Sequence, residues 1–590
     1  MKTANILTIG IFIAIFSAIT IPFHAAAQEE PQTGGFFGNM QPVPGVETIS
    51  AYPIIYINTV NSTPIDQKVT YIDAVAWFDA SNSDKYESLG SEDKPLELGI
   101  RGRGNASWLV DGPKPYKLKF EKKQPFFGLT KNKHWALLPV SSYQEFYNNM
   151  VGYEIGRQIG LPFLPKRLPV QVILNGQFIG IYMLSETLRI DEGRIEIFEQ
   201  PDENEDEATI PYGWLVEVDN YLDDNQIRFP DLANEGRNTR ITYHTPEVLS
   251  PKQEEWLYNH FTGFGAAAHE SNKLSRVWEN FVDIDYLARY FIVQEILHNM
   301  DAYVGSWYFH KDKGDEVWKA GPLWDMGWSF DRTKTMMLFE GTSYQVNFMK
   351  DITRFPRFLE KASEILDKYM EESPEKRMDD FIDSLKVEIG PAFTVNRQIW
   401  PDLGGNIYNT DAFCRMYFKS NIAYVKERLE SDLKTFRVNI HVNKENDGVL
   451  NENDVDPTLD AVVLVDGLEY NDFDVFADDK ITLEFKSIAR REVIAVTVNG
   501  EDFLEKVVGN SLMIEDINEN LDIEVTFGPV THIPDIEYGD EESPVKERLY
   551  LSIDKKYDLS KYLDSEDTVN WLTDTTADVV SVEPSGMVSP

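Results

Sequence analysis

The sequence predicts an α+β fold with two lobes, followed by all-β sandwich modules. Three observations lead to this prediction. Strand-like alternation dominates residues 49–220, helical periodicity dominates residues 250–435, and alternation returns after Phe436. A β-rich half followed by a helical half is typical of an α+β domain, and two such lobes usually meet at a cleft.

The first lobe is predicted from short segments of alternating apolar and polar residues. Strands are expected within residues 51–60, 68–80, 96–104, 116–121, 134–140 and 212–220, and a helix within 145–161. Residues 167–186 are predicted to form a hairpin, because Asn175-Gly176 is a residue pair favoured in two-residue turns.

The second lobe is predicted to be mainly helical. The segment 250–261 begins with Ser250-Pro251, a helix start signal, and 283–300 repeats apolar residues on one face. Residues 307–312 and 317–327 have strand–turn–strand character. Further helices are expected at 355–370, 376–390 and 413–436.

The C-terminal part is predicted to be all-β. Short alternating strands over residues 436–530 indicate a small β-sandwich, and 531–590 resembles a bacterial Ig-like domain that lacks its last strands. Within 443–454, "NKENDGVLNEND" has the spacing of a calcium loop. A polar turn is the favoured interpretation, because the last ligand position holds Asp454 and no helix precedes the segment.

The N-terminus has the layout of a secretory signal peptide. Residues 1–27 combine a basic start, an apolar stretch from Ile6 to Phe23 and small residues before polar sequence. An uncleaved anchor is the alternative, since the apolar run is close to spanning length. Residues 28–47 read as a flexible linker. We expect an exported protein of the periplasm, cell surface or medium, with no integral membrane segment after cleavage.

The net charge excludes some classes of partner, and the cysteine content excludes a disulfide within the chain. The 590 residues carry a net charge of −42, which argues against a general binder of nucleic acid or anionic membranes. The only cysteine, Cys414, cannot form a disulfide within its own chain and is expected in the core.

Two acids suggest chemistry. Asp301 follows the helical segment 283–300, and Asp325 stands among aromatic residues in "GPLWDMGWSF". An acid at a helix end and an acid at a strand end that face one cleft suit phosphoryl transfer, with one accepting a hydroxyl proton and one holding Mg²⁺. Local chemistry alone also allows two structural acids held by hydrogen bonds.

A glycine-rich loop precedes a basic strand. In "IRGRGNASW" the glycines allow close backbone approach and Arg103 offers a forked donor, while Lys117 and Lys119 lie on one face of the next strand. The pattern fits phosphate binding or an ordinary glycine-containing turn, and alternation does not choose between the two lysines.

Taken together, these segments resemble the CotH (spore-coat protein H) kinase-like family. The motifs "RGRGNASW", "KPYKLKF", "NNMVGYEIGRQIGL", "VILNGQFIGIYMLSETLRID", "NMDAYVGSWYFHKD" and "GPLWDMGWSF" occur in order within residues 48–435. The resemblance implies an atypical protein-kinase-like two-lobed domain and ATP- and Mg²⁺-dependent phosphorylation of serine or threonine in a protein substrate.

The resemblance also assigns site residues. Asp301 matches the catalytic acid, Asp325 the metal-binding acid, and Lys117 or Lys119 the lysine of the nucleotide phosphates. Arg103 and Asn105 match the RGN loop. Because protein kinases pair their nucleotide-binding lysine with a glutamate on a helix, we further expect Glu154 to pair with the lysine. Glu186 fits the family pattern without an assigned role.

Two positions depart from the family pattern. Gly327 stands where a second acid is usual, and Asn148 stands where arginine is frequent. The alternative function is therefore a catalytically weak or inactive kinase-like surface or adhesion protein that binds partners through its β modules.

Overall fold

The computed structural model describes most of the chain between residues 42 and 529. The described ranges are 42–49, 52–83, 85–109, 111–126, 128–140, 143–219, 225–230, 238–330, 334–341, 348–401, 410–444, 461–487 and 491–529, with short pieces at 557–558, 581–582 and 587–589. The predicted signal peptide, most of the linker, most of the calcium-like loop and nearly all of the predicted Ig-like domain lie outside these residues. No helix within the described ranges is long and apolar enough to cross a membrane.

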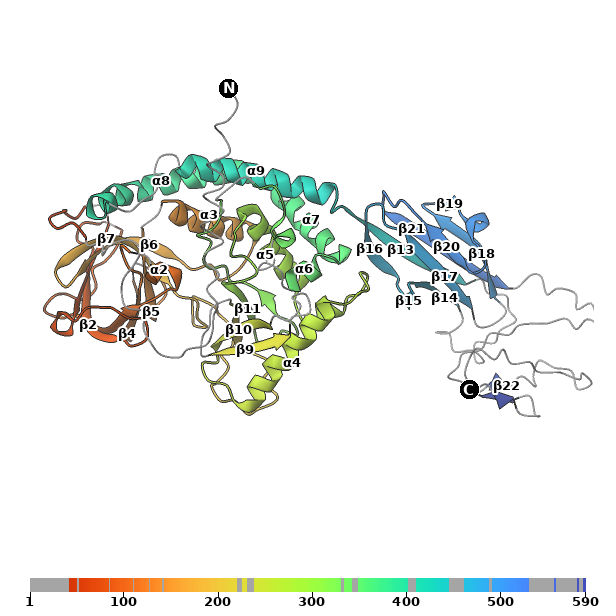
Figure 1. Cartoon of the computed structure of the whole chain (residues 1–590), viewed down its shortest axis with the longest axis horizontal. Coiled ribbons are helices and arrows are strands. Elements are labelled where there is room, and N and C mark those ends of the chain that lie inside the picture. Colours follow the sequence, from red (N-terminus) through yellow and green to blue (C-terminus); the bar gives the residue numbers. More distant parts are fainter. Residues whose placement is uncertain are drawn as a thin grey trace, which may run out of the picture.

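The N-terminal lobe is a closed β-barrel with strand order β1-β2-β3-β4-β5-β7-β6, at the left of Figure 1. Parallel pairing of β1 with β6 closes the barrel, and the other pairs are antiparallel. The strands are β1 (Ile54–Thr59), β2 (Ile72–Asp79), β3 (Leu96–Gly102), β4 (Tyr116–Gln124), β5 (Asn132–Pro139), β6 (Arg167–Leu174) and β7 (Gln177–Glu186). The sequence predicted these strands and not the closure, which depends on pairing between segments over a hundred residues apart.

Alternation along the barrel strands sorts side chains to two faces. On β4, Tyr116, Leu118 and Phe120 are buried in the barrel core, so Lys117 and Lys119 face outward. The predicted hairpin is confirmed: β6 and β7 pair across Asn175 and Gly176, which both have positive φ (51° and 79°).

The second lobe is built on a sheet of order β12-β11-β8-β10-β9. Its strands are β8 (Trp214–Val218), β9 (Gln226–Pro230), β10 (Asn238–Thr245), β11 (Trp307–Lys311) and β12 (Lys319–Ala320). The described helices are α2 (Ala106–Leu109), α3 (Tyr143–Ile159), α4 (Pro251–Ala268), α5 (Ile284–Leu297), α6 (Phe348–Ile352), α7 (Pro356–Glu371), α8 (Pro374–Ile399) and α9 (Thr410–Glu430). Ser250 caps α4 as the Ser-Pro signal predicted, with Gln253 completing a capping box.

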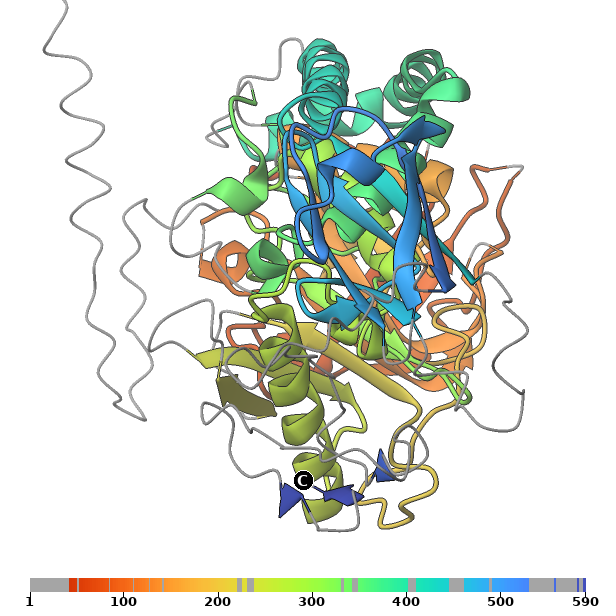
Figure 2. The same ribbon diagram turned by 90° about the vertical axis from the view of Figure 1, so that its right-hand side faces the viewer.

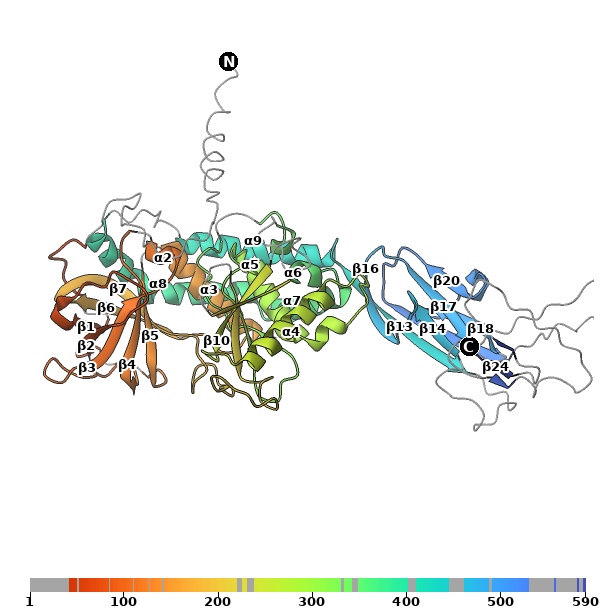
Figure 3. The same cartoon turned by 60° about the horizontal axis from the view of Figure 1, so that its bottom comes forward.

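Helix α5 lies at the centre of this lobe. Every residue from Tyr290 to Leu297 is buried, and the large core cluster includes side chains from α3, α5, α7, α8 and α9. Helices α8 and α9 run along one side of both lobes (Figures 1 and 3). On α8, Asn396 exchanges hydrogen bonds of 2.7 and 2.9 Å with the backbone of Ile181 on β7, which ties the helix to the barrel.

Two predicted helix ends were wrong. Helix α8 continues past Gly390 and Pro391 to Ile399, because residues on both sides of the proline pack into the core. Helix α9 ends at Glu430, and the segment assigned to its last turns begins β13 (Thr435–Lys444). Strand pairing with β16 (Asp472–Phe476) and β21 (Leu521–Pro529) therefore overrides the helical spacing near Phe436.

Residues 435–529 form two sheets around one apolar core. The first has the order β16-β13-β21-β18-β19 and the second β15-β14-β17-β20. Their strands are β14 (Ala461–Val465), β15 (Leu468–Glu469), β16 (Asp472–Phe476), β17 (Ile481–Ser487), β18 (Arg491–Val498), β19 (Glu501–Asp502), β20 (Ser511–Ile514) and β21 (Leu521–Pro529). Val438 and Val525 from the first sheet share a buried cluster with Leu483 and Leu512 from the second.

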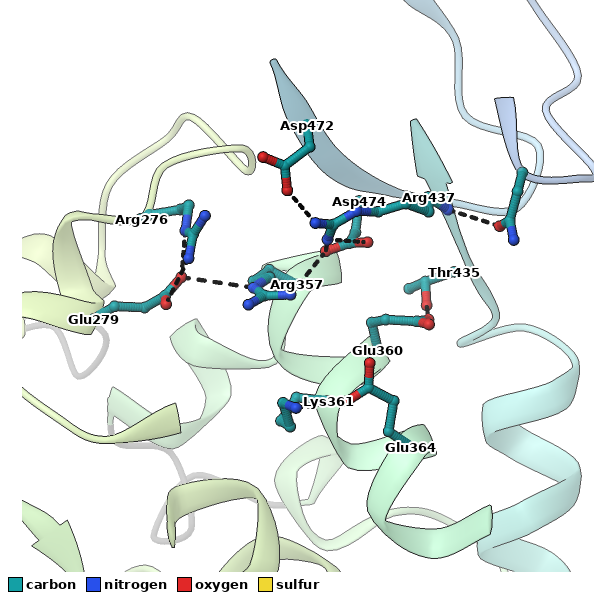
Figure 4. Close-up of polar contacts among 11 residues, drawn as sticks. Arg276, Glu279, Arg357, Glu360, Lys361, Glu364, Thr435, Arg437, Asp472 and Asp474 are labelled. Carbon is teal, nitrogen blue, oxygen red and sulfur yellow. Dashed lines mark hydrogen bonds and ion pairs between the residues drawn. The ribbon is translucent and has the colours of Figure 1, made fainter. Parts of the chain in front are cut away.

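This β module packs directly against the helical lobe (Figures 1 and 2). Figure 4 shows the polar contacts where they meet: Arg357 on α7 approaches Asp474 on β16 to 3.8 Å, and within the module Arg437 on β13 binds the same Asp474 at 3.0 Å. Asn272 also donates to the hydroxyl of Tyr470 at 3.0 Å. The module is thus fixed to α7, which itself packs on α5.

Candidate active site

Asp301 lies in the turn that follows α5. His298 ends the helix with left-handed backbone (φ 50°), and the backbone carbonyl of Asp301 accepts from the N–H groups of Val304 and Gly305 at 3.3 and 3.2 Å. The side chain is half-buried. Desolvation, with a contribution from the nearby negative charge of Asp325, raises the pKa of Asp301 to about 6. A carboxylate with such a pKa is suited to accept a proton near neutral pH.

Asp325 lies in an irregular segment after β12, where the sequence predicted a strand end. Its backbone is left-handed (φ 56°), and its carboxylate accepts a hydrogen bond from the N–H of Gly327. The side chain is accessible to solvent, yet the surrounding protein still removes enough water that desolvation raises its pKa. A side chain that is both accessible and closely surrounded lies in a recess of the surface.

Helix α3 positions the Asp325 segment. A Cβ at Gly152 would lie 2.9 Å from Met326, and a Cβ at Gly156 would lie 2.5 Å from Leu323, so both glycines allow the segment to pack directly on the helix. Asn149 accepts from the N–H of Met326 at 3.1 Å. The structure brings Asp301 and Asp325 together, since the N–H of Met300 donates to the carbonyl of Trp328 at 3.3 Å and the N–H of Phe330 to the carbonyl of Leu297 at 3.0 Å, which join the two segments. The charge of Asp325 accordingly acts on Asp301.

The glycine-rich loop is held in a compact turn. Gly104 has φ +82°, and a Cβ at Gly102 would lie 2.5 Å from the ring of Trp108. Lys68 donates to the carbonyl of Gly104 at 2.9 Å and to the side chain of Asn105 at 3.1 Å. Asn105 therefore stabilises the loop, while Arg103 faces the Asp325 recess.

Arg103 and Arg167 contact the same aromatic ring. Their guanidinium groups lie 5.4 and 5.2 Å from the ring centroid of Trp324, the residue before Asp325. Desolvation lowers the pKa of Arg103, and the charge of Asp325 opposes that shift. Arg167, on β6, was not identified from the sequence, because nothing in its local pattern marks it as part of a site.

Lys117 lines a pocket between the two lobes. The pocket has a volume of about 350 Å³ and is also lined by Arg189 after β7, Leu215 on β8 and His244 on β10. This volume falls in the range of small-molecule sites. Lys119 is exposed and does not line the pocket, so the geometry separates the two lysines that the sequence left equivalent.

The pocket is electropositive within a strongly acidic protein. Desolvation and the charges of Arg101, Arg189 and Arg103 lower the pKa of Lys117 to about 8. The same surroundings lower the pKa of His134, the cross-strand partner of Lys119, to about 3. Such a concentration of positive charge is costly unless an anion binds there.

Two further polar pairs were missed from the sequence. Glu217 on β8 binds His244 at 2.7 Å and accepts from Tyr308, which links the pocket to the sheet below it. Glu295 on α5 binds Lys334 at 2.8 Å, with both side chains almost fully buried. Neither pair joins residues close in sequence, so no local motif could have indicated them.

Comparisons with known proteins place the chain. The family model described as "CotH kinase protein" matches residues 100–431, which is more than half of the 590 residues. The chain belongs to the CotH kinase family. The matched range includes Asp301, Asp325, Arg103, Asn105 and Lys117.

One solved structure among the matches is that of the Helicobacter pylori proinflammatory kinase CtkA. It has 10% sequence identity and a TM-score of 0.26, over 56% of this chain and 95% of that one. This similarity is too low to support an inference from structure. A comparison with curated proteins gave no match.

The predicted pair between Glu154 and the CotH lysine is not formed. The carboxylate of Glu154 accepts from Arg157 at 2.8 Å and from Gln158 at 2.6 Å, both on its own helix α3. The acid whose charge acts on Lys117 is Glu247, in the wall of the pocket. The correction has a simple cause: neighbours three and four residues along a helix are within reach without any lobe movement.

The two departures from the CotH pattern contact each other. Asn148 is fully buried and donates to the carbonyls of Gly327, at 2.9 Å, and Ser329. Cys414 packs beside it, with its sulfur 3.7 Å from the Asn148 side-chain oxygen, and is buried as predicted. The side-chain amide of Asn148 therefore fixes the backbone that follows Asp325. In the family pattern, the positions of Asn148 and Gly327 both usually hold charged residues.

Glu186 is buried at the end of β7. One carboxylate oxygen accepts from the N–H of Lys166 at 2.9 Å, and within the described structure the other has no hydrogen-bond partner. Two guanidinium nitrogens of Arg194, whose charge acts on Glu186, are also unpartnered there. Glu186 and Arg194 therefore keep unpaired buried polar atoms, and Glu186 comes directly before residues 187–189, which line the pocket.

Proposed function

We propose that this CotH kinase is an ATP- and Mg²⁺-dependent kinase that phosphorylates serine or threonine in a protein substrate. The observation that carries the proposal is the proximity of Asp301 and Asp325, together with an electropositive interlobe pocket whose Lys117 is linked to Asp325 through the charge of Arg103. Export through the predicted signal peptide, and a substrate outside the cytoplasm, are part of the same proposal.

The residues present fit a nucleotide–magnesium complex. Mg²⁺ is commonly bound by one or two carboxylates together with phosphate oxygens and water. Asp325 supplies an accessible carboxylate, and Lys117 and Arg103 supply the cations that phosphates require. When bound, the metal would neutralise charge on the transferred phosphoryl group. The described residues contain no cluster of three or more His, Cys, Asp or Glu side chains poised for a metal, so the phosphates would complete the coordination.

Each residue then has a distinct task. Asp301, with its pKa raised to about 6, orients the acceptor hydroxyl and takes its proton. Lys117 holds phosphate oxygens at the pocket, and Arg103 continues that positive surface toward Asp325. The short-range packing on Gly152 and Gly156 keeps Asp325 fixed relative to Asp301.

The test is phosphate incorporation from labelled ATP into a mixture of exported proteins from the source cells. We expect Asp301→Ala and Asp325→Ala each to reduce incorporation at least about 100-fold while the circular dichroism spectrum is retained. The Asp325 variant should also lose the stimulation of ATP binding by Mg²⁺. Unchanged labelling by both variants would contradict the proposal and favour a binding protein with a kinase-like fold.

A further inference from the structure

Arg167 and Arg103 hold Trp324 between two positive charges at the edge of the recess. Arg103 comes from the loop after β3, Arg167 from β6, and Trp324 from the segment that carries Asp325. Both guanidinium groups lower the pKa of Asp325 through their charge, so both lie close to it. Three separate parts of the chain thus place two arginines around one carboxylate.

The arginines do not neutralise that carboxylate by direct contact. Among the described residues, neither guanidinium forms an ion pair with Asp325. The side chain of Arg103 also has no hydrogen-bond acceptor within the described structure, although desolvation lowers its pKa. Arg103 is only partly buried, and none of its nitrogens is among the buried unpartnered atoms of the described residues, so its unused donors are open to a ligand in the recess.

Arg167 is preorganised for the same ligand. Its Nε donates to Ser185 at 3.1 Å, and Nη2 donates to the hydroxyl of Tyr153. The guanidinium is also 4.6 Å from the ring centroid of Tyr153. These contacts fix the orientation of the fork and leave Nη1 without a hydrogen-bond acceptor among the described residues, so little side-chain entropy remains to be lost on binding.

We propose that Arg103 and Arg167 form a phosphate subsite that binds the terminal phosphates of a nucleotide even when no metal ion is present. This inference rests on the proposed function for the identity of the ligand as a nucleotide. The subsite would also accept other anions with two or more adjacent phosphates. Such an anion extends from Lys117 to Arg103 and on toward Asp325, because the charge of Arg103 acts on both Lys117 and Asp325. Planar guanidinium groups bind phosphate oxygens in pairs, which a lysine does not.

The subsite predicts separate contributions to anion binding from the metal ion and from the two arginines. Asp325 would hold a metal ion, which would neutralise phosphate charge, whereas Arg103 and Arg167 would hold the anion in the absence of the metal. Nucleotide binding in EDTA should therefore be weaker than with Mg²⁺ but measurable, and it should depend on Arg167, a residue outside the motifs of the sequence.

Calorimetry on the full chain tests the subsite with two probes in EDTA: ATP and inorganic pyrophosphate. We expect Arg103→Gln and Arg167→Gln each to weaken binding of both probes about tenfold or more, the cost of one or two charge-assisted hydrogen bonds. Arg167→Lys should recover only part of the affinity. Arg415→Gln is the matched control, because Arg415 is already paired with Asp379 at 3.0 Å on the far helices, and its affinity should equal wild type.

Four outcomes decide the matter. Loss of binding in both arginine variants, with the control unchanged and melting temperatures retained, supports the subsite. Wild-type affinity of both variants in EDTA overturns it, even when Mg-ATP binding and phosphate transfer persist and the proposed function stands. Pyrophosphate binding that depends on Arg167, without ATP binding in EDTA, overturns the subsite for a nucleotide and leaves the kinase to be tested with Mg-ATP. Absence of binding by the wild-type protein with either probe in EDTA overturns the subsite, and Mg-ATP then tests the kinase alone.

Discussion

Two regions of the molecule place a pair of arginines beside an aspartate, and they do so in opposite ways. At the interface in Figure 4, Arg437 binds the fully buried Asp474 at 3.0 Å and also binds Asp472, while Arg357 stands 3.8 Å away. In the recess at Asp325, Arg103 and Arg167 lie close to the carboxylate, and neither forms an ion pair with it among the described residues. The first arrangement satisfies its own charges, whereas the second leaves them for a ligand.

The difference separates a structural role from a binding role. A buried pair in contact stabilises a defined geometry, and removing one partner leaves an uncompensated charge. Charges held apart gain little from each other and raise the free energy of the unliganded site, which is the usual property of preorganised sites. Changes at the interface should therefore affect stability, and changes in the cleft should affect ligand binding.

The largest effect on stability is expected at the interface. Arg437→Met removes the main partner of Asp474, whose side chain has no accessible surface, so the free energy of unfolding should fall by about 3 kcal/mol. Urea unfolding followed by circular dichroism measures the change. Affinity for Mg-ATP at 20 °C should stay within about twofold of wild type, because Arg437 lies on β13, outside the cleft.

Lys376→Met provides the control for that comparison. Lys376 binds Asp380 at 2.6 Å, but both side chains are well exposed, so water and salt screen the pair and its loss should change the free energy of unfolding little. Equal losses in the two variants would show that burial of Asp474 does not matter, and the contrast between the two regions would fail.

The intermediate effect is expected at Asp301 and has the opposite sign. Its pKa in the folded protein, about 6, exceeds the ordinary value of 3.8, so folding favours the protonated form. Stability from this group is present at low pH and is lost as pH rises through 6. Without nucleotide or metal, Asp301→Asn should therefore raise the free energy of unfolding at pH 7.5 by about 1–2 kcal/mol.

The same substitution should abolish phosphate transfer, so stability and activity change in opposite directions. Wild-type transfer should decline as pH falls through about 6, when Asp301 gains a proton. Thermal melts at pH 7.5 and pH 4 provide the check: the gain in the variant should disappear at pH 4. A variant that is less stable than wild type at pH 7.5 would contradict a desolvated, ionised Asp301.

The same contrast explains what the sequence could reveal. The hairpin at Asn175-Gly176, the cap at Ser250 and the two acids depend on local patterns or ordered motifs, and the structure contains the hairpin and the cap and brings the acids together. Arg167 and His244 belong to strands whose local pattern is that of ordinary sheet. Their partners, Trp324 and Glu217, become neighbours only when distant segments fold together.

The smallest effect is expected at Glu154, where kinase logic and the structure disagree. If Glu154 held the nucleotide lysine, Glu154→Gln would weaken Mg-ATP binding about tenfold or more. In the structure its carboxylate is used by Arg157 and Gln158 on its own helix α3, so it is not available to the pocket lysine.

We therefore expect Glu154→Gln to bind Mg-ATP within about twofold of wild type in calorimetry, whereas Glu247→Gln, in the wall that faces Lys117, should change the affinity measurably. Removing the negative charge of Glu247 makes the pocket more positive, so the affinity of the anion should increase. A tenfold loss of Mg-ATP affinity in the Glu154 variant would mean that α3 changes its contacts when nucleotide binds. The binding site would then form by induced fit and would not be preorganised.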